Sequence, residues 1–463
     1  MTAQARSAPA VPAPAIITIA VLAALVTGRL FAEGHVPLAL AIVVAAAYLP
    51  LVFLDFQAAL AVWAGILFVA HLSALTVAPR AIAMLLVVGW LMGIVLVRVS
   101  DRLPVLRQYR GLTSGLVLFV TWLGLTRIWS LDPGLSEVEL TYWAGPLTLV
   151  IIAMTFNSLH GVRLIVIAML AGAAVSVLVG LMDGSGPAGG DAASLERFTA
   201  GGGDPNTQAA GYLVAICLAA GLLGVVRRPG ARIALIATAV LVTFGFFATQ
   251  SRGGLVGLGA AALLALIVTP RYRARILVLI AVVGVGLAVF LSSNEAALQR
   301  LTDAEGAGNE REDIWTVAWQ IFLDHPVLGS GLQSFQTVSP RYVLDSGPLA
   351  NVRLIAESPH LVHNIYLELL AETGIVGLAL FVFVVVACLR ASWLAARRFD
   401  AVGRSDCANL ARAVMVATVG ILVAGFFLSN INDFRMWILL GLGPVLLTLA
   451  RQGRAEARPH VVA

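Results

Sequence analysis

Long apolar stretches separated by short polar segments dominate the sequence. A helix that crosses a bilayer core about 30 Å thick needs roughly 20 mostly apolar residues. Fourteen stretches approach that length, with approximate bounds 15–32, 36–54, 57–77, 81–97, 112–129, 140–156, 162–182, 207–226, 232–249, 253–269, 275–292, 364–389, 410–428 and 434–450. Since a few of the early boundaries are ambiguous, the pattern predicts an all-α polytopic membrane protein with about 12–14 transmembrane helices.

The basic residues, all of them arginine, divide unevenly between the two sides of these helices. With the amino terminus inside, the inner segments hold 20 of the 30 basic residues but only five of the 25 acidic ones. Cytoplasmic loops carry the excess of basic residues in membrane proteins, so both termini are predicted to be cytoplasmic. The outer side is then acidic overall, and the few arginines on it need an anionic partner.

Composition excludes a soluble enzyme. Hydrophobic residues make up 60% of the chain and charged ones only 12%, whereas soluble domains carry about 25% charged residues. The mean hydropathy is +0.94. The net charge of +5 does not indicate nucleic-acid binding, because the arginines are scattered between apolar runs rather than gathered on one face. We expect no nucleic-acid partner and a location in a membrane.

Two outer segments are too long to be simple connectors, and they divide the chain. The predicted organisation is N-terminal helices at 1–182, an outer loop at 183–206, central helices at 207–292, a large outer loop at 293–363, C-terminal helices at 364–450 and a cytoplasmic tail at 451–463. In the large loop, Ile314, Trp315, Ala318, Trp319 and Phe322 share one helical stripe. This spacing predicts an amphipathic helix that either lies on the outer bilayer surface or caps the bundle.

Three outer arginines are candidates for binding an anion. Arg197 precedes Asn206 at the start of the eighth stretch, Arg252 opens the tenth, and Arg311 lies in the large loop. A helix that begins outside presents free N–H groups and the positive end of its dipole, an arrangement that binds phosphates. The alternative is an arginine that binds a lipid headgroup or an acid on another loop. Gly253 and Gly257 predict close helix packing.

Histidines are the candidates for acid–base chemistry. His360 and His363 stand just before the twelfth stretch, and a neutral imidazole with an ordinary pKa near 6.5 suits a general base. The two are so close that either could fill the role. A zinc site of His325, His360 and His363 is less favoured, because no cysteine or carboxylate pattern completes it.

Asn364 and two carboxylates follow these histidines into the helix. Glu368 and Glu372 lie one and two turns after Asn364. An unpaired carboxylate at membrane depth is costly. We therefore expect the two to pair with arginine or to line a cavity.

In these motifs the chain resembles the bacterial O-antigen ligase and O-antigen polymerase family. The likeness covers roughly 195–380. The motifs that carry it are Arg197 with Asp204-Pro-Asn-Thr207, Ser251-Arg-Gly-Gly254, Arg311 before Trp315, His325-Pro-Val-Leu-Gly-Ser-Gly331, His363-Asn-Ile-Tyr-Leu367 and Glu372-Thr-Gly374. The first six stretches carry no such signature.

The resemblance implies a type C glycosyltransferase fold and a glycan donor built on undecaprenyl diphosphate. It implies that Arg197, Arg252 and Arg311 bind the diphosphate, and that His363, or His360 in its place, activates the acceptor hydroxyl. Supporting roles would fall to Asn206, Asn364, Glu368 and Glu372. No cofactor or metal is expected, and displacement at the anomeric carbon would invert its configuration.

Two alternatives remain open. A ligase transfers a finished glycan to a glycan or lipid acceptor, whereas a polymerase joins repeat units on the carrier; the long 293–363 loop favours the ligase slightly. A polysaccharide or lipid flippase belongs to another class. It is less favoured, because transporters show repeated halves and no repeat is found here.

Overall fold

The computed structural model describes residues 24–69, 78–96, 107–132, 137–182, 197–199, 203–294, 297–299, 309–343, 349 and 360–456. Within these ranges every regular element is a helix. Eight of the helices are long and apolar enough to cross a membrane, and shorter apolar helices accompany them. The predicted class, an all-α polytopic membrane protein, is confirmed.

The predicted stretches from 36–54 onward each overlap a helix, because hydropathy and helix length report the same physical requirement. The helices are α2 (Val36–Leu54), α3 (Phe56–Ile66), α4 (Ala78–Leu96), α6 (Arg110–Leu125), α7 (Glu137–Thr155), α8 (Leu159–Met182), α9 (Pro205–Leu223), α10 (Pro229–Ala248), α11 (Arg252–Val268), α12 (Arg273–Ser292), α17 (Ile365–Ala401), α18 (Ser405–Ala424) and α19 (Phe434–Glu456). Short 3-10 turns follow α6, α11 and α18: η3 (Thr126–Ile128), η4 (Pro270–Tyr272) and η5 (Gly425–Phe427). The stretch at 15–32 lies partly outside the described residues, as does the end of the one at 57–77.

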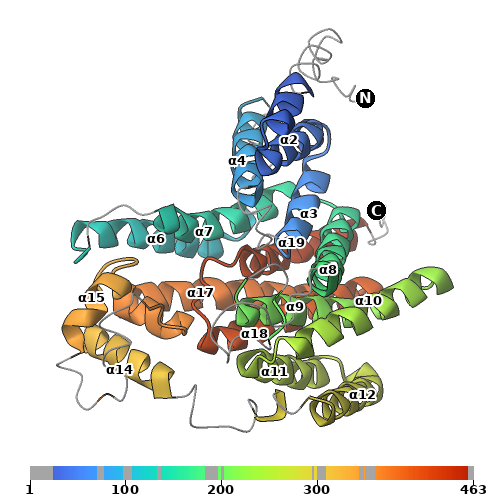
Figure 1. The fold of residues 1–463 in the computed structure, drawn as a ribbon. Coiled ribbons are helices and arrows are strands. Elements are labelled where there is room, and N and C mark those ends of the chain that lie inside the picture. Colours follow the sequence, from blue (N-terminus) through green and yellow to red (C-terminus); the bar gives the residue numbers. More distant parts are fainter. Residues whose placement is uncertain are drawn as a thin grey trace, which may run out of the picture.

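The long helix α17 runs through the middle of the bundle (Figure 1). It packs against α6, α18 and α19, while α18 packs in turn against α9 and α11. The amino-terminal helices α2 to α4 lie on one flank and α12 on the opposite one. The apolar segment of α19 is 83% buried, whereas that of α12 is 0% buried. Because α12 is apolar on all sides, its surroundings in the membrane are lipid.

A break in α17 ties the large loop to the bundle. At Gly374 the backbone leaves the helical region, with φ 66° and ψ −173°, so neighbouring N–H and C=O groups lose their partners within the helix. The turn at 325–331 replaces those partners. It does so through three backbone hydrogen bonds of 2.9 Å, from Ile375 N–H to the Pro326 carbonyl, from Ser330 N–H to Ala371 and from Gly331 N–H to Glu372.

Only glycine fits where the turn meets the break. A Cβ atom on Gly374 would overlap the Val327 carbonyl oxygen, and one on Gly329 would overlap the backbone of Glu372. From the other side, the indole N–H of Trp122 donates to the Thr373 carbonyl at 2.9 Å. The motifs 325–331 and 372–374 are therefore two halves of one structural joint.

The large loop also contains the predicted helix, α14 (Asn309–Asp324), followed by the shorter α15 (Phe335–Tyr342). The face of α14 that packs onto α15 and the start of α17 is formed by Ile314, Val317, Ala318 and Ile321. Trp319 is 47% exposed and contacts Phe322. The helix thus packs onto the bundle with one face (Figure 1), while Trp319 remains exposed.

We expect Gly374→Ala to destabilise the protein. An alanine in the left-handed region costs about 1–2 kcal/mol, and overlap with Val327 adds to that cost. The measurement is the thermal unfolding midpoint of the detergent-purified chain, followed by tryptophan fluorescence. Gly284→Ala is the matched control, because Gly284 lies within α12 and its Cβ would meet no atom within 4 Å. Equal midpoints for the two variants would contradict the role of the joint.

Candidate functional site

Helices α9 and α11 begin next to each other, and the side chain of Asn206 contacts residues at this junction. Asp204 caps α9 by accepting hydrogen bonds from the N–H groups of Asn206 (3.2 Å) and Thr207 (3.0 Å). Ser251 caps α11 by accepting from Gly254 N–H at 3.1 Å. The Ser251 hydroxyl also donates to Asn206 Oδ1 at 2.8 Å. Asn206 therefore joins the two helix starts, where free N–H groups and positive dipole ends gather.

Arg197 is fixed at the same junction. Its Nε donates to the Thr249 carbonyl at the end of α10, and its Nη2 donates to Asn206 Oδ1, both at 2.9 Å. Arg252 is the first residue of α11, directly after the capping Ser251. The structure thus brings Arg197, Asn206 and the start of the Arg252 helix together, although 55 residues separate the two arginines.

Helix α14 brings Arg311 to this end of the bundle. One turn after Arg311, the indole N–H of Trp315 donates to the Val362 carbonyl at 3.0 Å. The Trp315 ring also lies 6.5 Å from the ring of Phe427. Phe427 packs so closely on α11 that a Cβ on Gly253 would lie 2.7 Å from it. One aromatic side chain therefore links the segment that carries Arg311 to the start of the helix that carries Arg252.

His363 lies between these elements with a strained backbone. Its φ of 54° is in the left-handed region, and its N–H donates to the Ser429 hydroxyl at 2.9 Å. The next residue, Asn364, caps α17 by accepting from Tyr366 N–H and Leu367 N–H.

The surroundings of His363 disfavour the protonated form of its imidazole. Burial lowers the pKa of His363 from its ordinary value of 6.5, and the positive charge of Arg311 lowers it further. Asp204 opposes the shift, and His360 adds weakly to it. Since these groups act on one imidazole, Arg311, Asp204 and His360 all surround His363.

The surroundings of His360 and His325 differ from those of His363. His360 Nε2 is buried and has no hydrogen-bond partner among the described residues. His325 Nε2 is 3.4 Å from the Tyr342 hydroxyl. Within the described ranges no group of three or more His, Cys, Asp or Glu side chains could hold a metal ion.

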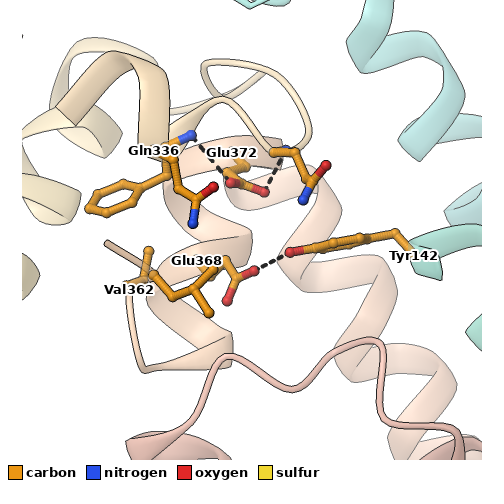
Figure 2. A pocket seen from close by; sticks show the side chains of 8 residues that line it. Tyr142, Gln336, Val362, Glu368 and Glu372 are labelled. Atoms are coloured by element: carbon orange, nitrogen blue, oxygen red, sulfur yellow. Dashed lines mark hydrogen bonds between the residues drawn. The ribbon is translucent and has the colours of Figure 1, made fainter. Parts of the chain in front are cut away.

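Glu368 and Glu372 both line a pocket beside the start of α17 (Figure 2). The carboxylate of Glu372 accepts backbone N–H bonds from Gln333 at 2.8 Å and from Phe335 at 3.3 Å, so it anchors the turn before α15. Glu368 accepts a hydrogen bond from the Tyr142 hydroxyl on α7. Of the two environments expected from the sequence, the structure shows the cavity.

The sequence analysis missed a buried ion pair near this junction. Arg435 grips Asp433 with Nε at 2.9 Å from Oδ1 and Nη2 at 2.7 Å from Oδ2, and Nη2 also donates to the Thr207 carbonyl on α9 at 3.0 Å. Their side chains are 5% and 6% exposed. An arginine at membrane depth is the signal that could have found it.

The fold and the site define a polytopic membrane protein with arginines and a neutral histidine gathered where α9, α11 and α17 begin. Residues 237–382 match the model of the O-antigen ligase family. The match runs from α10 into α17 and includes Arg252, Arg311 and His363. Over these residues the chain is similar to the O-antigen ligase family, in agreement with the resemblance that the motifs indicate. No curated protein matches the chain.

We expect Arg435→Met to destabilise the fold by about 3–5 kcal/mol, because it leaves the buried Asp433 carboxylate without its partner. The double variant Arg435→Met with Asp433→Leu should recover much of that loss, since no charge is then buried. Thermal unfolding in detergent measures both. Arg29→Met, which breaks the exposed pair with Glu33, is the control and should leave the midpoint unchanged. A double variant no more stable than the single one would refute the explanation.

Proposed function

We propose that the chain is an O-antigen ligase-like glycosyltransferase. It transfers a glycan from undecaprenyl diphosphate to an acceptor hydroxyl at the outer face of the bacterial inner membrane, with both termini cytoplasmic. One observation carries the proposal. Asn206 joins Arg197 to the start of the Arg252 helix, while Arg311 acts on a histidine that is kept neutral.

The arginines supply the charge that the reaction needs. As the bond from the anomeric carbon to the diphosphate breaks, its electron pair moves to the leaving phosphate oxygen. Guanidinium groups already fixed at that position stabilise the developing charge without reorganising. Arg197 is held at two of its nitrogens, and Arg252 adds its charge to the dipole of α11. We assign the diphosphate to Arg197, Arg252 and Arg311.

His363 is the proposed general base, with His360 as the alternative. It takes the proton of the acceptor hydroxyl while the acceptor oxygen forms its bond to the anomeric carbon on the face opposite the diphosphate. Such a transfer inverts the carbon and gains about 10²–10⁴-fold from the base. The strained φ of His363 supports the assignment, because backbone strain of about 1–3 kcal/mol is retained chiefly at functional sites.

The supporting residues hold this geometry. Asn206 connects two helix starts, Asn364 caps α17 next to the base, and Glu372 anchors the turn of the large loop. None of these roles requires contact with substrate. The resemblance implies a type C glycosyltransferase architecture, and the loop that caps the bundle is compatible with it.

We expect His363→Ala and Arg252→Ala to lower glycan transfer by at least about 10²-fold and to cause lipid-linked donor to accumulate in membranes. Arg232→Ala is the matched control, since Arg232 is exposed near the start of α10 and lies outside the site. Transfer is measured on membranes from a strain lacking the protein, complemented with each variant. Wild-type transfer by both site variants would show that the assignment is wrong.

The products of the purified enzyme separate the two activities of the family. Elongated glycan still on its carrier identifies a polymerase, whereas glycan on a second acceptor identifies a ligase. We expect the ligase product with an inverted anomeric linkage; a retained linkage would exclude direct displacement.

We also expect a characteristic pH dependence. A histidine with a lowered pKa stays neutral down to lower pH, so kcat/KM should be constant near pH 7 and fall only below about 6.5, as the base becomes protonated. In Arg311→Gln the apparent pKa should rise, because a nearby positive charge that opposes protonation is gone. A profile measured from pH 5 to 8 tests this, and an unchanged or lower apparent pKa in Arg311→Gln would count against His363 as the base.

A further inference from the structure

A polar pocket lies next to His363 and is distinct from the arginine cluster. It is lined by Tyr142, Gln333, Phe335, Gln336, Leu361, Val362, Glu368 and Glu372. These side chains come from α7, from α15 and the turn before it, from α17, and from the two residues that precede His363. Figure 2 shows Tyr142, Gln336, Glu368 and Glu372 converging on it. None of the described residues that line it is an arginine.

One oxygen in this pocket lacks a partner. Glu368 is 3% exposed, and its Oε1 accepts from the Tyr142 hydroxyl. The Ser429 hydroxyl donates a second hydrogen bond to the carboxylate, while no described residue donates to Oε2. A buried carboxylate oxygen without a donor is costly. A ligand that brings a hydroxyl donor would remove that cost.

The chemistry of the lining selects the ligand. Two carboxylates without a lining arginine repel a phosphate, whereas sugar hydroxyls donate to carboxylates with charge-assisted strength. The amides of Gln333 and Gln336 can donate or accept, and Phe335 and Val362 offer apolar surface to the C–H face of a ring.

We propose that this pocket binds a sugar ring of the acceptor and that Glu368 Oε2 accepts a hydrogen bond from one of its hydroxyls. The inference rests on the proposed function. The cations hold the donor diphosphate on their side of segment 361–364. The acidic pocket borders the same segment and holds the acceptor next to the base. Glu368 is a binding residue in this scheme, and Tyr142 fixes its orientation.

The first experiment measures binding without catalysis. Saturation-transfer NMR on the full-length, detergent-purified chain reports the affinities for D-glucose, D-galactose and N-acetyl-D-glucosamine, and isothermal titration calorimetry reports that for inorganic diphosphate as the charged comparison. We expect Glu368→Gln and Tyr142→Phe to weaken binding of the preferred sugar about 10-fold, since a bond to a charged acceptor becomes one to a neutral or misoriented acceptor. Diphosphate binding should not change. Glu33→Gln, an exposed carboxylate far from the pocket, is the matched control.

The second experiment measures transfer. The acceptor is lipopolysaccharide core and the donor is lipid-linked glycan, both purified from a strain lacking this protein. We expect the KM for the acceptor to rise about 10-fold in both variants, with the KM for the donor and the thermal unfolding midpoint unchanged. Tyr142→Phe keeps the inference testable if Glu368→Gln does not fold.

The outcomes distinguish the pocket from the proposed function. Sugar binding that depends on Glu368 in a protein without transfer activity supports the pocket and refutes the function. Active variants with wild-type acceptor KM and wild-type sugar binding refute the pocket alone. A rise in the KM of the donor only would assign the pocket to the donor glycan and overturn the inference.

Discussion

The opened backbone at Gly374 is the constraint on which the rest of the structure depends. In a membrane-spanning helix, unsatisfied backbone groups cost several kcal/mol each, because no water is present to bind them. The turn at 325–331 supplies the missing partners through three backbone hydrogen bonds. The large loop is therefore part of the helix bundle, and a folded α17 requires the loop to be docked.

Docking the loop determines where the functional groups lie. The chain enters the joint from α14 and leaves it toward α15, so Arg311, Gln333 and Gln336 are placed relative to α17 by the same joint. Trp315 then fixes Val362, the residue before His363, and Glu372 fixes the turn before α15. Each of these hydrogen bonds joins a side chain to a backbone group, so together they fix the path of the chain on both sides of the joint.

The sequence predicts the helices well and the joint poorly. Hydropathy alone located stretches that overlap α2 to α19, because lipid imposes one simple requirement on each span. The helical stripe from Ile314 to Phe322 indicated a helix in the large loop. Nothing in the sequence showed which backbone groups the turn at 325–331 would pair with, since that pairing depends on the break at Gly374. The ion pair between Arg435 and Asp433 was not predicted for a related reason. The two residues are close in sequence, but their burial depends on packing against α9, which is distant in sequence. The left-handed backbone of His363 could not be predicted either, because the residue type alone does not indicate it.

Groups of both charge signs lie near the short segment that carries His363, and under the proposed function they would serve two unlike substrates. Arg311 lowers the pKa of His363, so the cation that would attract a diphosphate also keeps the base unprotonated. If the same charges lined the pocket of Glu368, its carboxylate would be neutralised by an arginine and would no longer need a hydroxyl donor. Instead the described lining pairs Glu368 only with Tyr142. Under the proposed function, a neutral, hydroxyl-rich ligand and an anionic one would therefore bind different residues next to a single imidazole.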